Sequence, residues 1–156
     1  MVTAHVYFRD DVVYLTSVEK DVFGILHDGH LHLKLGEPLA PHDLGDAVCA
    51  AFAAYREGTP GTPYVRGVRR PLDPFLRFAG FKSWKGFEKG AQLFIVLDRG
   101  EHIEILPSVP GPTGGFLHQP DRTLRCSRNV DDIGRALIEM ASRGKSASES
   151  RRSATP

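Results

Sequence analysis

The chain carries the same short pattern of residues twice, and this repeat constrains its fold more than any other feature. Gly24-Ile25-Leu26-His27 matches Gly115-Phe116-Leu117-His118, and Asp43-Leu44-Gly45-Asp46-Ala47-Val48 matches Asp132-Ile133-Gly134-Arg135-Ala136-Leu137. The spacing from the glycine to the aspartate is 19 residues in the first copy and 17 in the second. We interpret the pattern as a tandem duplication of one structural unit, with chance similarity between short apolar strings as the alternative.

Each copy is expected to form three strands followed by a helix. Leucine alternates strictly with polar residues from His30 to Leu35, which is typical of a half-buried strand. Leu44, Val48 and Ala51 recur at the spacing of one helix face. The expected strands are 6–9, 12–16, 30–35, 92–97, 102–106 and 122–126. The expected helices begin near Pro41 and near Asn129 or Asp131, and they end at Gly58 and Gly144.

The two copies together predict one α+β domain. Neither copy can cover both its sheet and its helix alone, so we expect the halves 1–59 and 91–143 to share one core within a single domain, 1–143. The expected fold is a mostly antiparallel sheet built from two repeated strand-strand-strand-helix units, with their helices packed on one face of the sheet. The tail, 144–156, has no large apolar residue and is expected to be disordered.

Residues 60–90 are expected to form a small helical insertion between the halves. Glu57 to Pro63 is rich in Gly, Thr and Pro, which predicts a loop. Asp73 before Pro74 predicts the start of a short helix, and Ser83 predicts the start of a second helical turn. Aromatic residues recur every three positions, which favours packing in a core: Phe75, Phe78, Phe81, Trp84 and Phe87.

Charge is distributed unevenly, although the formal net charge is only +1. Residues 1–59 hold four Lys or Arg and nine Asp or Glu, a net charge of −5. Residues 60–90 hold seven and two, a net charge of +5. The small total excludes a strongly basic sleeve for nucleic acid. The separation predicts a surface for a charged partner, with a merely solvated basic face as the alternative.

The sequence contains no motif typical of catalysis or metal binding. There are seven histidines but no His-Glu-x-x-His or Cys-x-x-Cys spacing, so we expect no metal site and no cofactor. No Ser or Cys lies in a nucleophile signature, and the chain is expected not to be an enzyme. A small hydrolase with His27 and His118 in a shared cleft is an alternative. With no long apolar run and no signal peptide, a cytoplasmic location is expected.

One string in the insertion resembles a family of bacterial immunity proteins: Phe81-Lys82-Ser83-Trp84-Lys85-Gly86-Phe87-Glu88-Lys89-Gly90-Ala91. The similarity continues through a strand pair, Pro107, the turn at Gly114-Gly115-Phe116 and the last repeat motif at 132–137. These proteins belong to contact-dependent growth inhibition systems, in which each neutralises the toxin delivered by a neighbour. The resemblance implies a cytoplasmic protein without catalytic activity that binds a cognate toxin domain, commonly a nuclease, as a stoichiometric complex. It implies no membrane partner and no direct contact with nucleic acid.

The surface that would bind the toxin depends on the charge of the toxin. A basic nuclease would face the acidic first half, whereas an acidic active site would face the arginines of the insertion. The candidate partner-binding residues are Asp10, Asp11, Asp21, Asp28, Arg66, Arg69, Arg70, Lys82 and Lys85. The alternative function from another class is a small RNA-binding module that uses the basic and aromatic segment 64–89.

Overall fold

The computed structural model describes residues 1–60 and 73–152, with side chains described as far as Gly144. The first copy of the repeat contains β1 (Val2–Arg9), β2 (Val12–Asp21), β3 (Leu26–Gly36) and α1 (Pro41–Ala53), and β4 (Arg56–Thr59) follows it. The insertion contains α2 (Pro74–Ala79) and α3 (Trp84–Glu88). The second copy contains β5 (Ala91–Asp98), β6 (Ile103–Pro110), β7 (Phe116–His118), the 3-10 helix η1 (Pro120–Arg122), β8 (Leu124–Cys126) and α4 (Val130–Arg152).

The strands form one sheet whose order reflects the repeat. The order is β3-β2-β1-β5-β6-β7, with β8 also paired to β6 and β4 paired to β2. The first strands of the two copies, β1 and β5, therefore meet antiparallel at the centre, and each copy extends outward from there. All pairs are antiparallel except that between β2 and β4. The predicted α+β class and the mostly antiparallel sheet are confirmed, and the second copy contains four strands where three were expected.

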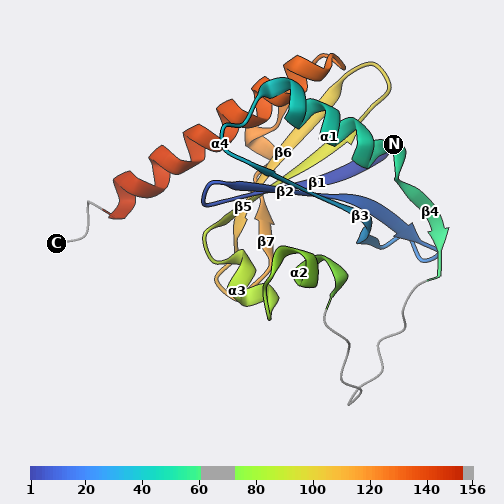
Figure 1. Cartoon of the computed structure of the whole chain (residues 1–156), viewed down its shortest axis with the longest axis horizontal. Coiled ribbons are helices and arrows are strands. Elements are labelled where there is room, and N and C mark those ends of the chain that lie inside the picture. Colours follow the sequence, from blue (N-terminus) through green and yellow to red (C-terminus); the bar gives the residue numbers. More distant parts are fainter. Residues whose placement is uncertain (61–72, 153–156) are drawn as a thin grey trace.

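The helices of the two copies, α1 and α4, lie side by side over the same face of the sheet (Figure 1). Leu44 and Val48 of α1 and Ile133 and Leu137 of α4 are fully or almost fully buried in one core with Val6 and its neighbours on the sheet. These four helical positions correspond in the two repeat motifs, so the shared motif encodes the shared core. Burying such side chains stabilises the fold by about 1.5–3 kcal/mol each.

A glycine in each repeat motif lets the two helices touch. A Cβ atom on Gly45 would lie 2.0 Å from the carbonyl oxygen of Val130, and one on Gly134 would lie 1.8 Å from that of Pro41. Pro41 and Val130 are the first residues of α1 and α4, so each glycine meets the start of the other helix. The contact is reciprocal, as a pseudo-twofold duplication requires.

The insertion helices lie on the opposite face of the sheet, beneath it in Figure 1. Phe75 and Phe87 are fully buried there against Tyr7, Tyr14 and Leu93. Both helix starts agree with the sequence, since the Asp73 carboxylate accepts the Phe75 N–H at 2.8 Å and the Ser83 hydroxyl accepts the Gly86 N–H at 3.1 Å. The sheet is thus covered by helices on both faces.

The structure differs from the prediction in most strand boundaries, by a few residues each, and in three larger features. α1 ends at Ala53 instead of Gly58, and Arg56–Thr59 forms the parallel strand β4 instead of a loop. α4 continues past Gly144 to Arg152. Gly144 therefore does not end the helix. It permits close packing of α4 on β5, since a Cβ atom at this position would lie 1.7 Å from the side-chain amide nitrogen of Gln92. Residues 61–72 of the insertion and 153–156 of the predicted disordered tail lie outside the described residues.

Candidate functional site

A polar cluster lies on the sheet face that α2 and α3 cover, and it joins β1 to β3 across β2. His5 Nδ1 and Asp28 Oδ1 are 2.7 Å apart, and the Tyr7 hydroxyl lies 3.4 Å from both Asp28 carboxylate oxygens. The next residue, Gly29, packs directly on Ser17 of β2, where a Cβ atom would lie 2.4 Å from the Ser17 hydroxyl. Burial first, and the Asp28 charge second, raise the pKa of Tyr7 well above its ordinary value. The phenol therefore stays protonated and can donate to Asp28.

His32 lies beside this cluster and contacts the insertion. Its Nδ1 lies 3.1 Å from the Thr16 hydroxyl, and its ring packs against Phe75 and Phe78 at centroid distances of 5.7 Å and 5.6 Å. Burial lowers the pKa of His32, although the charges of Asp28 and Asp73 oppose that shift. The neutral ring is thus the form that docks α2. The polar cluster thus has a structural role, since the Asp28 carboxylate and the Tyr7 hydroxyl bind each other.

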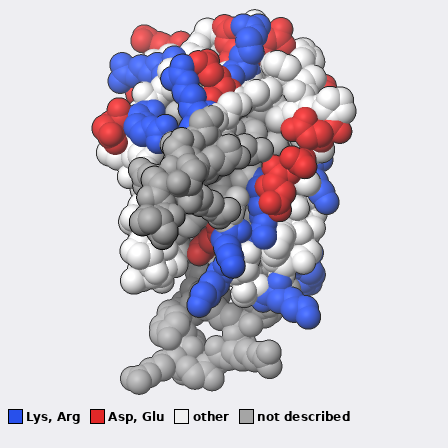
Figure 2. Space-filling model, turned by 90° about the vertical axis from the view of Figure 1, so that its left-hand side faces the viewer, with Lys and Arg blue, Asp and Glu red and all other residues white. Residues whose placement is uncertain are grey.

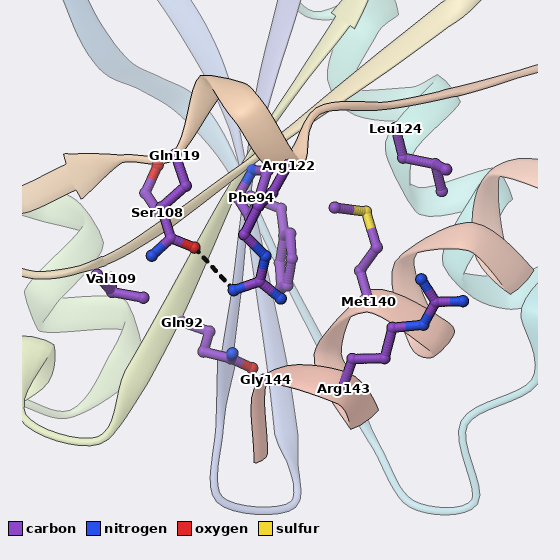
Figure 3. A pocket seen from close by; sticks show the side chains of 11 residues that line it. Gln92, Phe94, Ser108, Val109, Gln119, Arg122, Leu124, Met140, Arg143 and Gly144 are labelled. Carbon is purple, nitrogen blue, oxygen red and sulfur yellow. Dashed lines mark hydrogen bonds between the residues drawn. The ribbon is translucent and has the colours of Figure 1, made fainter. Parts of the chain in front are cut away.

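A cavity of about 210 Å³ opens between the middle of α4 and the second copy of the sheet (Figure 3). Arg122 projects toward the same space as Gln92 and Gln119, and its guanidinium donates to the Gln119 side chain at 3.0 Å. Phe94 and Met140 supply apolar walls. Guanidinium and amide groups over an apolar floor suit a small anionic group.

The structure separates the two histidines of the hydrolase hypothesis. His27 is on β3 and His118 is on β7, and these strands lie at opposite ends of the main strand order with four strands between them. At about 4.8 Å per strand, the two are more than 20 Å apart. The predicted shared cleft is therefore wrong. His118 Nδ1 instead lies 2.8 Å from the hydroxyl of Ser108, which is 1% exposed. Among the described residues, no group of His, Cys, Asp and Glu could hold a metal ion.

The exposed candidate residues gather at one end of the first hairpin. Asp10 and Asp11 form the turn between β1 and β2, and the Asp10 side chain is 83% exposed. The preceding Arg9 donates to the Gly86 and Phe87 carbonyls of α3 at 2.7 Å and 2.8 Å. This places the turn near the exposed lysines of that segment, Lys82 and Lys85. Figure 2 looks at this side of the molecule and shows basic side chains gathered below a group of acidic ones.

The other candidate aspartates lie elsewhere and are occupied. Asp21 ends β2, which spans ten residues from the first turn, so it lies about 30 Å from Asp11. Asp21 is only 6% exposed, and Asp28 is held by His5 and Tyr7. The structure therefore does not bring the four aspartates onto one surface. Arg66, Arg69 and Arg70 lie outside the described residues. The partner contacts assigned to all of these residues stay predictions.

The distinctive Lys-Ser-Trp-Lys string forms part of the fold. Ser83 caps α3, and Trp84 stacks on Phe75 with ring centroids 5.6 Å apart. Phe87 lies at the centre of the aromatic cluster, so the core position predicted for it is confirmed. The RNA-binding alternative needs aromatic faces that are open to bases. In the described part of 64–89, Phe78 is the exposed large apolar side chain, and 42% of its surface is accessible.

Sequence reasoning missed one surface as a site. The segment 22–26, where β2 turns into β3, carries exposed apolar side chains, although the sequence pattern indicated Gly24 to His27 only as a part of the repeat. The available signal was the run Val22-Phe23-Gly24-Ile25-Leu26 at a place where a turn was needed.

None of the helices in 1–60 and 73–152 has the length and apolar character to cross a membrane.

Comparisons with known proteins identify a shared fold. Neither models of protein families nor curated proteins match the sequence. A solved protein of unknown function from Neisseria meningitidis is similar with a TM-score of 0.67 and 15% identity, over 91% of this chain and 94% of that one. A chain of the CdiA-CT/CdiI toxin and immunity complex from Yersinia pseudotuberculosis is similar with a TM-score of 0.62 and 17% identity, over 91% and 96%. Most of this chain thus shares its fold with a chain of a toxin and immunity complex and with a protein of unknown function.

Proposed function

We propose that this chain is an immunity protein that binds and neutralises the toxin domain of a contact-dependent growth inhibition system. The observation that carries the proposal is the fold shared, over nearly the full length of both chains, with a chain of a toxin and immunity complex. The resemblance of the 81–91 string to immunity proteins points to the immunity partner of such a pair. The protein would act in the cytoplasm and form a stoichiometric complex with one cognate toxin.

Inhibition would come from covering a surface of the toxin, with no chemical step by this chain. Its most connected polar groups are used within the fold: Asp28 binds His5 and Tyr7, and Ser108 lies against His118. A specific complex of this kind buries about 1,600 Å² in total. A chain with this fold can supply that area from the sheet edges, turns and helix ends that remain exposed.

The proposed toxin activity is that of a nuclease. A domain that cleaves nucleic acid needs basic side chains on its substrate surface to bind phosphates. The first half of this chain has a net charge of −5, and its exposed Asp10 and Asp11 can attract such a domain. Complementary charge speeds encounter and favours one partner over others.

The test is co-purification with the toxin domain encoded next to this chain, followed by light scattering of the complex. A toxin domain of unrelated sequence serves as the control. We expect a one-to-one complex with the neighbouring domain and none with the control. Free chains at micromolar concentrations of both proteins would contradict the proposal. RNA binding that weakens steeply with salt would then favour the alternative function.

A further inference from the structure

The turn between β2 and β3 concentrates the exposed apolar surface of the molecule. We call residues Val22 to Leu26 the apolar turn. Its exposed fractions are 64% for Val22, 79% for Phe23, 56% for Ile25 and 42% for Leu26. These are four of the seven large apolar side chains that are exposed in the described part of the chain. Single exposed apolar residues are ordinary, but a contiguous group marks an interaction surface.

The fold holds the apolar turn in one shape. The Asp21 carboxylate, almost completely buried, accepts the N–H groups of Phe23 and Ile25, both at 2.9 Å, through one oxygen. Its other oxygen lies 3.0 Å from His27 Nε2. The Val22 N–H donates to the Thr59 carbonyl of β4 at 3.1 Å. Burial alone would raise the pKa of Asp21, but these bonds from His27 and the backbone lower it. The apolar side chains are therefore presented in a preorganised form, which reduces the entropy cost of binding.

The second copy of the repeat provides an internal control. Its corresponding turn, Gly111 to Gly115, has Thr113 in the place of Val22 and Gly114 in the place of Phe23, and it closes with a 2.8 Å bond from the Gly111 N–H to the Gly115 carbonyl. Phe116, which matches Ile25 in the repeat, packs inward against Tyr7 at 5.9 Å. The fold thus makes this connection without exposed apolar residues at its tip. The composition of the apolar turn must serve something other than folding.

We propose that the apolar turn is the central contact with the toxin domain and inserts Phe23 and Ile25 into an apolar cleft of that domain. This inference rests on the proposed function. A protruding turn fits a concave site, and buried aromatic anchors carry most of the binding energy in such interfaces. The half of the chain that carries the turn has a net charge of −5, which would draw a basic toxin domain toward this half of the molecule.

The test compares serine substitutions at matched exposed positions in the full chain. Phe23→Ser and Ile25→Ser each remove an apolar side chain from the turn. Leu117→Ser is the control, since Leu117 matches Leu26 in the repeat and is 56% exposed, as Ile25 is. The probe is the toxin domain encoded next to this chain, titrated calorimetrically at fixed salt. We expect Phe23→Ser to weaken binding at least 30-fold, the threshold of a binding hot spot, and Leu117→Ser less than about threefold.

The outcomes separate the two proposals. If the unaltered chain binds the toxin domain and both turn variants bind equally well, the inference is overturned while the proposed function stands. If the unaltered chain does not bind the domain, both are overturned. Light scattering adds a third result: a dimer that becomes a monomer in Phe23→Ser with full toxin affinity would assign the turn to self-association and overturn the inference. Circular dichroism confirms that each variant is folded, and Ile25→Ser provides the result if Phe23→Ser is not.

Discussion

The two copies of the repeat agree where they touch each other and differ at their outer edges. Leu44 and Ile133, and Gly45 and Gly134, occupy matching places in α1 and α4 and form the shared core and the helix contact. At the edges, the first copy has one strand of 11 residues, β3, whereas the second has two strands of three residues separated by η1. The first copy presents an apolar turn, and the second a turn of Pro, Thr and Gly. The matching positions preserve the fold, and the differing ones are free to carry function.

The largest expected effect tests the aromatic cluster that both copies share. Phe87 is fully buried, and its ring lies 5.1 Å from Phe75 and 5.2 Å from Tyr7. Phe87→Ala should lower the free energy of unfolding by about 3–5 kcal/mol, because it removes the ring and leaves a cavity. Phe78→Ala, at a position 42% exposed, is the control and should cost less than about 1 kcal/mol. Urea denaturation measures the free energy of unfolding of both variants. Equal losses would show that the buried Phe87 contributes no more to stability than the partly exposed Phe78.

The symmetry of the helix contact can be broken at either glycine. Gly45→Ala and Gly134→Ala each place a methyl group against a carbonyl of the other helix, so the helices must move apart. Each should destabilise the protein by about 1–3 kcal/mol, despite the better helix propensity of alanine. Gly36→Ala is the control, since no atom lies within 4 Å of its Cβ position. If one helix glycine tolerates alanine and the other does not, the contact is not reciprocal.

The two turns should differ in their dependence on a single carboxylate. Asp21→Asn keeps the size of the side chain but weakens the bonds that hold the apolar turn, so the melting temperature should fall by several degrees. Glu88→Gln, which affects the exposed 3.0 Å bond to the Gly115 N–H, should change it little. Because the pKa of Asp21 is lowered on folding, its contribution is present above about pH 4 and is lost at lower pH. Equal melting temperatures for the two variants would contradict the comparison.

The smallest expected effect is the response of the insertion to mild acid. Burial lowers the pKa of His32 on folding, so its contribution is present above the unfolded pKa of about 6.5 and is lost as pH falls through the folded value. Stability should therefore decline slightly from pH 7 to pH 5, and the decline should be smaller in His32→Gln. Denaturation at both pH values measures this. If stability depends on pH equally in His32→Gln and in the unaltered chain, the decline comes from other titratable groups.

Much of the fold was predictable because both copies of the repeat contain the apolar residues that form the shared core. The shared core and the antiparallel sheet follow from the repeat, whereas the pairing of β1 with β5 became known only from the structure. The caps at Asp73 and Ser83 were predictable because each is set by residues adjacent in sequence. The continuation of α4 was not predictable, because Gly144 serves a contact with Gln92 that lies 52 residues away in sequence. The short strand β4 was missed for the same reason, since its pairing with β2 is set by tertiary contact.

The candidate site was harder to predict than the fold. Net charge by segment pointed to Asp21 and Asp28, but it could not show that one holds a turn and the other bridges two strands. The sequence alone does not distinguish a buried aspartate from an exposed one. The apolar turn was overlooked because its residue types are those of a core. Only the fold shows that Phe23 lies at the surface.

The central claim is that this chain neutralises its neighbouring toxin domain by binding it. The most direct measurement is a titration of the toxin activity with increasing amounts of the purified chain at fixed salt. We expect the toxin activity to fall linearly and to be lost at one equivalent of the chain, as for a tight stoichiometric complex. Full toxin activity in the presence of excess chain would contradict it.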